Sequence, residues 1–161
     1  MNKKLLYYTG SLILVILLSG SAMPLAENPP RWQLEMLQEV NKLRARGCRC
    51  GSSFMPKAPA LRLNPQLSQA AQSHAEDMQK RDYFDHRSPE GKSFGDRVSA
   101  ANYRWAMVGE NIAWNYREVK AVVDGWRRSP GHCRNLMSRS FTEMGAGMDG
   151  VYFVQVLAHP M

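Results

Sequence analysis

The order of segments along the chain predicts an α+β fold in a single domain. Segments with helical periodicity come first, and strand-like segments gather near the C-terminus. Helices and strands do not alternate as they would in repeating βαβ units. The chain has 161 residues, of which 44% are hydrophobic and 22% charged. That composition provides one buried core and excludes a disordered tail.

The first 26 residues are typical of a secretory signal peptide. Two lysines precede an apolar run that ends at Leu18, and small residues follow. The run is shorter than the roughly 20 apolar residues of a spanning helix, so a permanent anchor is the second interpretation. Cleavage after Ala22 or Ala26 would leave a single domain, residues 27–161, with no transmembrane segment. We therefore expect a secreted or periplasmic protein.

The mature chain is predicted to be basic. Loss of the two lysines in the signal peptide lowers the net charge from +7 to about +5. A basic surface suits anionic lipid headgroups or wall polymers of the cell envelope, although an ordinary solvated surface has a similar excess. No nucleic-acid-binding motif is present, so we expect no nucleic-acid partner.

Export also favours a disulfide, because cysteines outside the cytoplasm tend to pair. The chain has three cysteines, Cys48, Cys50 and Cys133. The first two are too close in sequence to bond each other without strain, so one of them should pair with Cys133. Closing this loop of about 85 residues would stabilise the fold by roughly 4–5 kcal/mol. We favour Cys50, because Gly51 allows a tight turn, and keep Cys48 as the alternative.

Helical periodicity predicts two long helices in the first half of the chain. Residues 31–47 carry apolar side chains at helical spacing and end in a glycine. Residues 48–63 are interrupted by Gly and Pro, which predicts a loop. A second helix is predicted over residues 64–82, because Asn64 suits the capping position and Pro65 the first helical position.

Shorter elements are predicted in the second half. In order they are a loop, a short helix, a turn or strand, two helices and a β-hairpin, over residues 83–94, 94–103, 106–114, 118–128, 130–137 and 143–160. Asp149 and Gly150 are a strong two-residue turn signal and predict the turn of the hairpin.

Four polar residues beside Gly or Pro breaks are candidates for chemistry: His86, Glu110, His132 and Glu143. Side chains at such breaks are often aimed into a cleft. Two imidazoles and two carboxylates can bind a divalent metal such as zinc, or act as general acid and base on a water molecule. Solvated loop residues are the alternative interpretation.

The stretch "SPGHC" separates a candidate site residue from a structural one. Ser129 is predicted to cap a helix that has Pro130 at its first position, which puts His132 in the first turn. The partial positive charge there favours a neutral imidazole, the form that binds metal or accepts a proton. Cys133 points about 100° away, toward the core side, which argues against a Cys/His pair.

The other histidines have plainer interpretations. His74 lies on the apolar face of the second predicted helix, where a hydrogen-bonded core histidine is more common than a ligand. His159 lies near the C-terminus and is interpreted as incidental. HExxH, GxSxG, P-loop and dinucleotide-binding motifs are absent from the sequence.

Six motifs in order resemble the CAP superfamily of cysteine-rich secretory, antigen five and pathogenesis-related proteins, also called SCP-like extracellular proteins. They are most similar to its bacterial branch and extend from about Val40 to Gly147. The motifs are "VNKLRARG", "LRLNPQLSQAAQSHAEDM", "YFDHRSPEG", "GENIAW", "GWRRSPGHCRNLM" and "FTEMGAGM".

The resemblance implies a three-layer α-β-α sandwich with a small antiparallel sheet between helices. It also implies a cleft with two histidines and acidic residues, which in some members holds a divalent metal. By motif, His86, Glu110 and His132 match this cleft. The acid that plant and animal members carry after the tryptophan matching Trp126 is missing here, so Glu143 is carried over from the bacterial pattern.

Three hypotheses for function remain open, because CAP members are associated with lipid or sterol binding, signalling and proposed proteolysis. The first is an exported binding module whose cleft takes a divalent metal or a small or lipid ligand, which the absence of a strong nucleophile favours. The second is a hydrolase that acts through an activated water. The third is an envelope interaction protein with a vestigial cleft.

Overall fold

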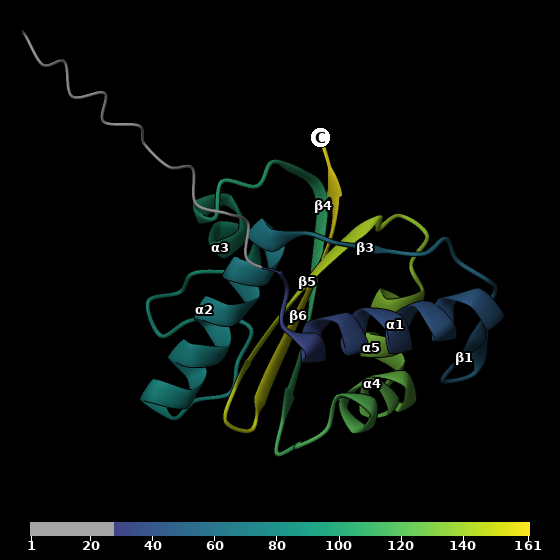
Figure 1. Ribbon diagram of the computed structural model, residues 1–161, viewed down its shortest axis with the longest axis horizontal. Helices are drawn as coiled ribbons and strands as arrows, with labels where there is room; N and C mark the ends of the chain where they lie inside the picture. The colour runs from purple at the N-terminus through teal and green to yellow at the C-terminus, as the bar shows by residue number, and fades with distance from the viewer. Residues whose placement is uncertain (1–27) are drawn as a thin grey trace, which may run out of the picture.

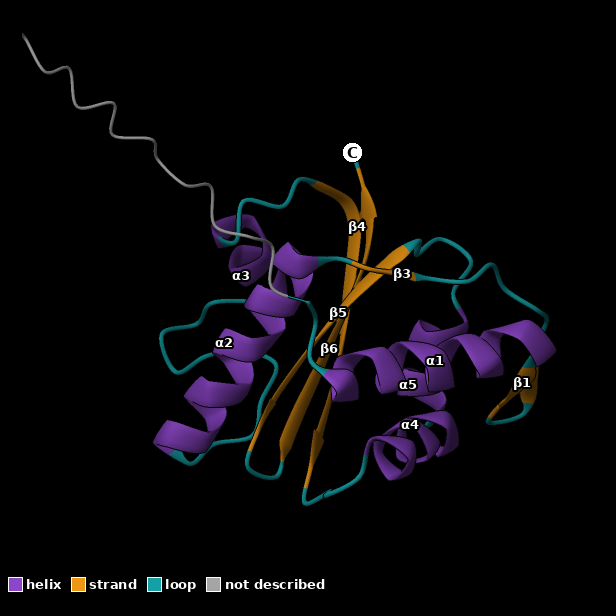
Figure 2. Cartoon of the chain, in the orientation of Figure 1, coloured by secondary structure: helices purple, strands orange, loops and turns teal. Residues whose placement is uncertain are grey.

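A four-stranded sheet separates two layers of helices, as the cartoon coloured by secondary structure shows (Figure 2). The computed structural model describes residues 28–161, so the predicted signal peptide lies outside the described residues. The elements in order are α1 (Arg31–Arg46), β1 (Cys48–Cys50), β2 (Ser53–Met55), β3 (Arg62–Leu63), α2 (Pro65–Arg81), α3 (Phe94–Ala100), β4 (Trp105–Trp114), α4 (Val119–Arg128), α5 (Pro130–Met137), β5 (Glu143–Asp149) and β6 (Tyr152–Pro160). The predicted α+β sandwich is confirmed.

The strands of the main sheet run in the order β3-β5-β6-β4. The pairs β5–β6 and β6–β4 are antiparallel, and the short β3 pairs parallel to β5. The C-terminal hairpin forms as predicted, but its turn is displaced by one residue. Asp149 pairs with Tyr152 as the last residue of β5, so the two turn residues are Gly150 and Val151. Gly150 takes the positive φ of 55° that this turn requires.

Helices α2 and α3 cover one face of the sheet (Figure 1). Two glycines of β5 let α2 approach closely. A Cβ atom on Gly145 would lie 2.1 Å from the backbone carbon of Leu67, and one on Gly147 would lie 2.3 Å from that of Ala71. The Gly-Ala-Gly sequence of β5 is therefore explained by backbone-to-backbone packing.

Helices α1, α4 and α5 cover the other face of the sheet (Figure 1). The fully buried Arg44 of α1 fixes this layer, because its guanidinium donates to four backbone carbonyls, those of Pro59, Leu136, Ser138 and Phe141. Burial lowers the pKa of Arg44 to about 10, which still leaves it charged at neutral pH. Because Leu136 and Ser138 lie at the C-terminal end of α5, the Arg44 side chain joins α1 to the end of α5.

The loop predicted over residues 48–63 is partly wrong, because it contains β1, β2 and β3. The hairpin β1–β2 closes through a two-residue turn in which Gly51 has a φ of 65°. These strands are two or three residues long, which is too short for alternating polarity to reveal them. Among the helices in the described part of the chain, none combines the length and apolarity needed to cross a membrane.

Candidate functional site

A pocket of about 270 Å³ brings together two of the predicted histidines. It is lined by Phe84, Asp85, His86, Ile112 and His132. These residues come from the loop between α2 and α3, from β4 and from the start of α5. Three segments far apart in sequence therefore meet at the β4 edge of the sheet.

Glu110 lies beneath His86 with its side chain fully buried. One carboxylate oxygen lies 2.8 Å from Nδ1 of His86, and the other accepts a hydrogen bond of 2.7 Å from Arg97. Because an ionised carboxylate only accepts hydrogen bonds, Nδ1 of His86 carries a proton, so in the neutral ring the lone pair is on Nε2. Arg97 also donates to the backbone carbonyl of His86, at 3.0 Å, so it holds both partners.

His132 occupies the first turn of α5, as predicted, and is half-buried. Burial is the main cause that lowers the pKa of His132 below its ordinary value of 6.5, and a protonated His86 acts on this pKa in the same direction. The imidazole is therefore neutral at neutral pH. Ser129 is the N-cap residue of α5, as predicted, but its side chain makes no capping hydrogen bond, and its backbone carbonyl accepts from the backbone N–H of Cys133.

Two side chains attach the edge strand β4 to α4 and α5. Asn135 donates its amide to the backbone carbonyl of Glu110, at 3.2 Å, and Trp126 donates its indole N–H to that of Ile112, at 3.0 Å. Asn135 also donates to the side chain of Asn111, whose amide bonds Gln155. These bonds fix where α5 starts relative to Glu110, and so where His132 enters the pocket.

Sequence reasoning missed Arg97 and Asn135. Arginine in a short amphipathic helix and asparagine after a "GHC" motif both resemble ordinary surface residues. The one available signal was that a buried acid in the "GEN" motif requires a cationic partner.

Glu143 lies elsewhere, at the start of β5. Its carboxylate accepts from the hydroxyl of Tyr103 at 2.8 Å, from the amide of Asn64 at 2.9 Å and from Arg62 at 3.3 Å. Within the described residues, none of its hydrogen bonds reaches His86, Glu110 or His132. The structure thus brings together three of the four candidates and ties the fourth to the N-terminus of α2.

The remaining histidines lie outside the pocket lining. His74 is buried in α2, as a core histidine should be, and its Nε2 lies 2.9 Å from the backbone carbonyl oxygen of Asp85. Burial is the main cause that lowers its pKa, which keeps the ring neutral as a donor. His159 is exposed and its Nδ1 lies 3.5 Å from the hydroxyl of Thr142.

A disulfide joins Cys50 of β1 to Cys133 of α5, the pairing that Gly51 favoured, and Cys48 is free. Within residues 28–161, these three cysteines are the only group of three or more His, Cys, Asp or Glu whose ligand atoms lie within 4.8 Å of one another. The pocket therefore brings two imidazoles together, with Glu110 behind one of them, and within residues 28–161 they are not part of a closed group of four such side chains.

The chain is similar to several bacterial proteins. It is 38% identical to the uncharacterized membrane protein YlbC of Bacillus subtilis (strain 168) over 88 residues, which cover 55% of this chain and 25% of that protein. It is 34% identical to the uncharacterized protein YkwD of the same strain over 87 residues, which cover 54% and 34%. The matched part of the chain thus covers only 25% and 34% of the length of these relatives.

A solved structure has the same fold over most of the chain. An extracellular protein containing an SCP domain, from Bacillus anthracis str. Ames, superposes with a TM-score of 0.71 at 28% identity. The match covers 79% of this chain and 40% of that one. A model of the cysteine-rich secretory protein family, CAP, matches residues 37–155. The chain therefore belongs to the cysteine-rich secretory protein (CAP) family.

Proposed function

We propose that this chain is an exported CAP-domain protein whose pocket binds a divalent metal such as zinc, or a small ligand, through His86 and His132. The observation that carries the proposal is the fully buried Glu110, whose two oxygens are occupied by His86 and Arg97. A carboxylate that orients an imidazole from behind is the usual support of a metal-binding histidine.

Each of the two histidines provides a nitrogen atom that could coordinate a metal. The Nδ1–H bond to Glu110 leaves Nε2 of His86 as a donor atom for a metal. The lowered pKa of His132 keeps its ring unprotonated and able to coordinate at neutral pH. A bound metal would supply Lewis acidity, with water or ligand atoms in its remaining positions.

Glu110 is assigned here as the orienting acid rather than a ligand. Glu143 is left outside the site, because Tyr103 and Asn64 hold its carboxylate. With two protein ligands, the site should bind zinc more weakly than a structural site with four. Such a site would also accept an external ligand readily.

Zinc titration by calorimetry tests the proposal on the mature chain. His132→Ala should abolish binding, and Glu110→Gln should weaken it 10- to 100-fold, the usual effect of losing an orienting carboxylate. His159→Ala is the matched control, because this histidine is exposed outside the pocket. Equal zinc affinity in the wild type and His132→Ala would refute the metal site.

Hydrolysis is a second candidate, favoured by the neutral imidazole of His132 in an open pocket beside His86. A neutral imidazole can take a proton from an attacking water. Turnover of a peptide library should then be lost in His132→Ala and kept in His159→Ala. Equal turnover in the wild type, His132→Ala and His159→Ala would show that a contaminating enzyme cleaves the peptides, and it would refute hydrolysis by this pocket.

Export is supported by the predicted signal peptide and by the extracellular SCP-domain protein from Bacillus anthracis, to which the chain is similar. N-terminal sequencing of the protein recovered from an expressing bacterium tests it. A new N-terminus after Ala22 or Ala26 is expected. An intact Met1 on all of the protein would refute cleavage and favour the membrane-anchor interpretation.

A further inference from the structure

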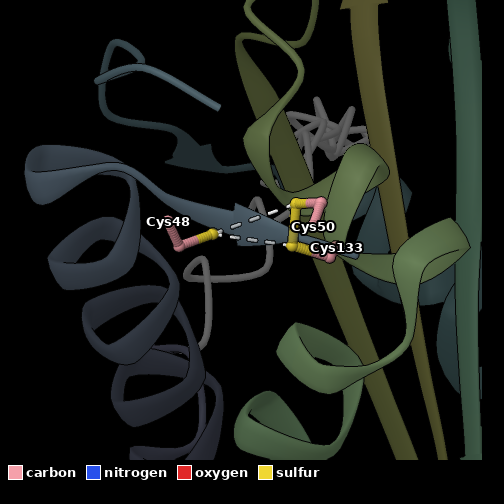
Figure 3. Close-up of side chains that lie close together, drawn as sticks. All are labelled: Cys48, Cys50 and Cys133. Carbon is pink, nitrogen blue, oxygen red and sulfur yellow. Dashed lines mark hydrogen bonds between the residues drawn. A yellow bond between two sulfur atoms is a disulfide. The ribbon is translucent and has the colours of Figure 1, made fainter. Parts of the chain in front are cut away.

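Three cysteines from two elements meet beside α5. Cys48 and Cys50 lie two residues apart on β1, so both side chains leave the strand on the same face. Cys133 lies near the start of α5, which packs against β1. The Sγ atom of Cys48 lies 3.5 Å from that of Cys133 and 3.9 Å from that of Cys50 (Figure 3).

We propose that these cysteines form a thiol–disulfide exchange centre, in which Cys48 replaces Cys50 as the partner of Cys133. Cys48 loses its thiol proton to water and its sulfur attacks Sγ of Cys133. The Cys48–Cys133 bond forms as the Cys50–Cys133 bond breaks, and the electron pair leaves on Cys50, which takes up a proton. The step is an isomerisation and requires no oxidant or reductant.

The geometry selects Cys133 as the sulfur that is attacked. It is the nearer of the two, and attack on Cys50 would create a bond between Cys48 and Cys50, only two residues apart, which is strained. Cys48 is nearly equidistant from both bonded sulfurs and so lies beside their bond. A rotation of the Cys48 side chain must therefore bring its sulfur into line before attack.

Both isomers keep α5 attached to β1. The two disulfides span 83 and 85 residues, so they close loops of nearly equal length and equal chain entropy. The turn of the β1–β2 hairpin also packs against α5, because a Cβ atom on Gly51 would lie 3.3 Å from the ring of Pro130. The hairpin can therefore stay in place while the bond moves.

The exchange changes which thiol is free. In the structure the free thiol is on the half-buried Cys48, whereas Cys50 is only 2% exposed. One isomer thus presents a thiol that small reagents can modify, and the other conceals it. Burial raises the pKa of Cys48, against the charges of Arg127 on α4 and Arg46 on α1, so exchange should be slow at neutral pH and faster in mild alkali.

The first experiment uses the variant Cys50→Ser. Oxidised and unfolded in acid, it should show no free thiol on alkylation, because Cys48 and Cys133 have bonded. The variant Cys48→Ser should likewise show no free thiol. The double variant Cys48→Ser/Cys50→Ser is the matched control and should show one free thiol, that of Cys133. Two free thiols in folded Cys50→Ser, with its fold checked by circular dichroism, would overturn the proposal.

The second experiment follows the wild type, so it does not depend on any variant folding. The protein is held at pH 8.5, quenched in acid at intervals, alkylated and digested with trypsin, which cuts at Arg49 between the two cysteines. The label should begin on Cys48 and move in part to Cys50, at a rate independent of protein concentration. A label that stays on Cys48, or a rate that rises with concentration, would refute internal exchange.

Discussion

The ring of His74 holds the backbone of the residue that precedes His86. Its Nε2 lies 2.9 Å from the carbonyl oxygen of Asp85, which connects the buried face of α2 to the pocket loop. A histidine outside the pocket lining therefore helps to position one inside it.

Loss of this bond should destabilise the fold. His74→Leu would leave the Asp85 carbonyl without its donor, at a cost of about 1–3 kcal/mol in the free energy of unfolding. Urea denaturation monitored by tryptophan fluorescence measures the change. His74→Gln keeps an amide donor and is the matched control, with a smaller loss expected. An equal loss in both variants would show that packing, not the bond, matters.

Stability should decline as the pH falls below about 6.5. The pKa values of His74 and His132 are lowered in the folded state, chiefly by burial, from an ordinary value of 6.5. The unfolded chain then binds protons that the folded chain does not, so unfolding is favoured as the pH falls through this window. Urea midpoints at pH 7.5, 6.5 and 5.5 test this. His74→Gln should show a shallower pH dependence, and an unchanged slope would contradict the assignment.

The close approach of α2 to β5 predicts that a Gly→Ala substitution at this contact lowers the stability of the fold, whereas the same substitution in an open helical position does not. Gly147→Ala would place a Cβ 2.3 Å from the backbone of α2 and should cost about 3 kcal/mol or more. Gly131→Ala is the matched control, because this residue lies in α5 and an added Cβ would have no atom within 4 Å apart from its own helix backbone and chain neighbours. It should be neutral or stabilise by up to about 1 kcal/mol. Thermal unfolding of both variants decides the point.

Arg97 and Glu110 should behave as a coupled pair. Arg97→Met would leave the buried carboxylate of Glu110 without its cation, at a cost of about 3–5 kcal/mol. Adding Glu110→Gln to this variant removes the unpaired charge and should recover part of the loss. A double-mutant cycle from urea denaturation measures the coupling. Strictly additive losses would show that the pair is not coupled.

The sequence predicted the helices well because their ends carry local signals. The bounds of α5 were predicted in full, and its start was signalled by Pro130, since proline is favoured at the first position of a helix. The side chain of Asn64 caps α2 through the backbone N–H groups of Gln66 and Leu67, as its position indicated. The sequence carried weaker signals for the ends of the strands. The turn at Gly150, for example, depends on the register of β5 against β6 and not on the Asp-Gly pair alone.

The candidate site was predictable in its residue types and less so in its connections. His86, Glu110 and His132 follow from motifs, but the location of Glu143 depends on β5 pairing with β3, which places it beside Asn64. Arg97 could not be found locally, since its function comes from α3 folding beside the middle of β4, where Glu110 lies 13 residues further along the chain. Such long-range contacts leave no periodicity in the sequence.

The side chains of Asn135 and Trp126 also protect the sheet from other chains. An edge strand with free backbone groups is a template for strand addition and aggregation. On β4 the carbonyls of Glu110 and Ile112 already accept hydrogen bonds from these two side chains. The bonds that position α4 and α5 thus also block intermolecular β-pairing along the pocket edge, and their loss would expose the protein to self-association.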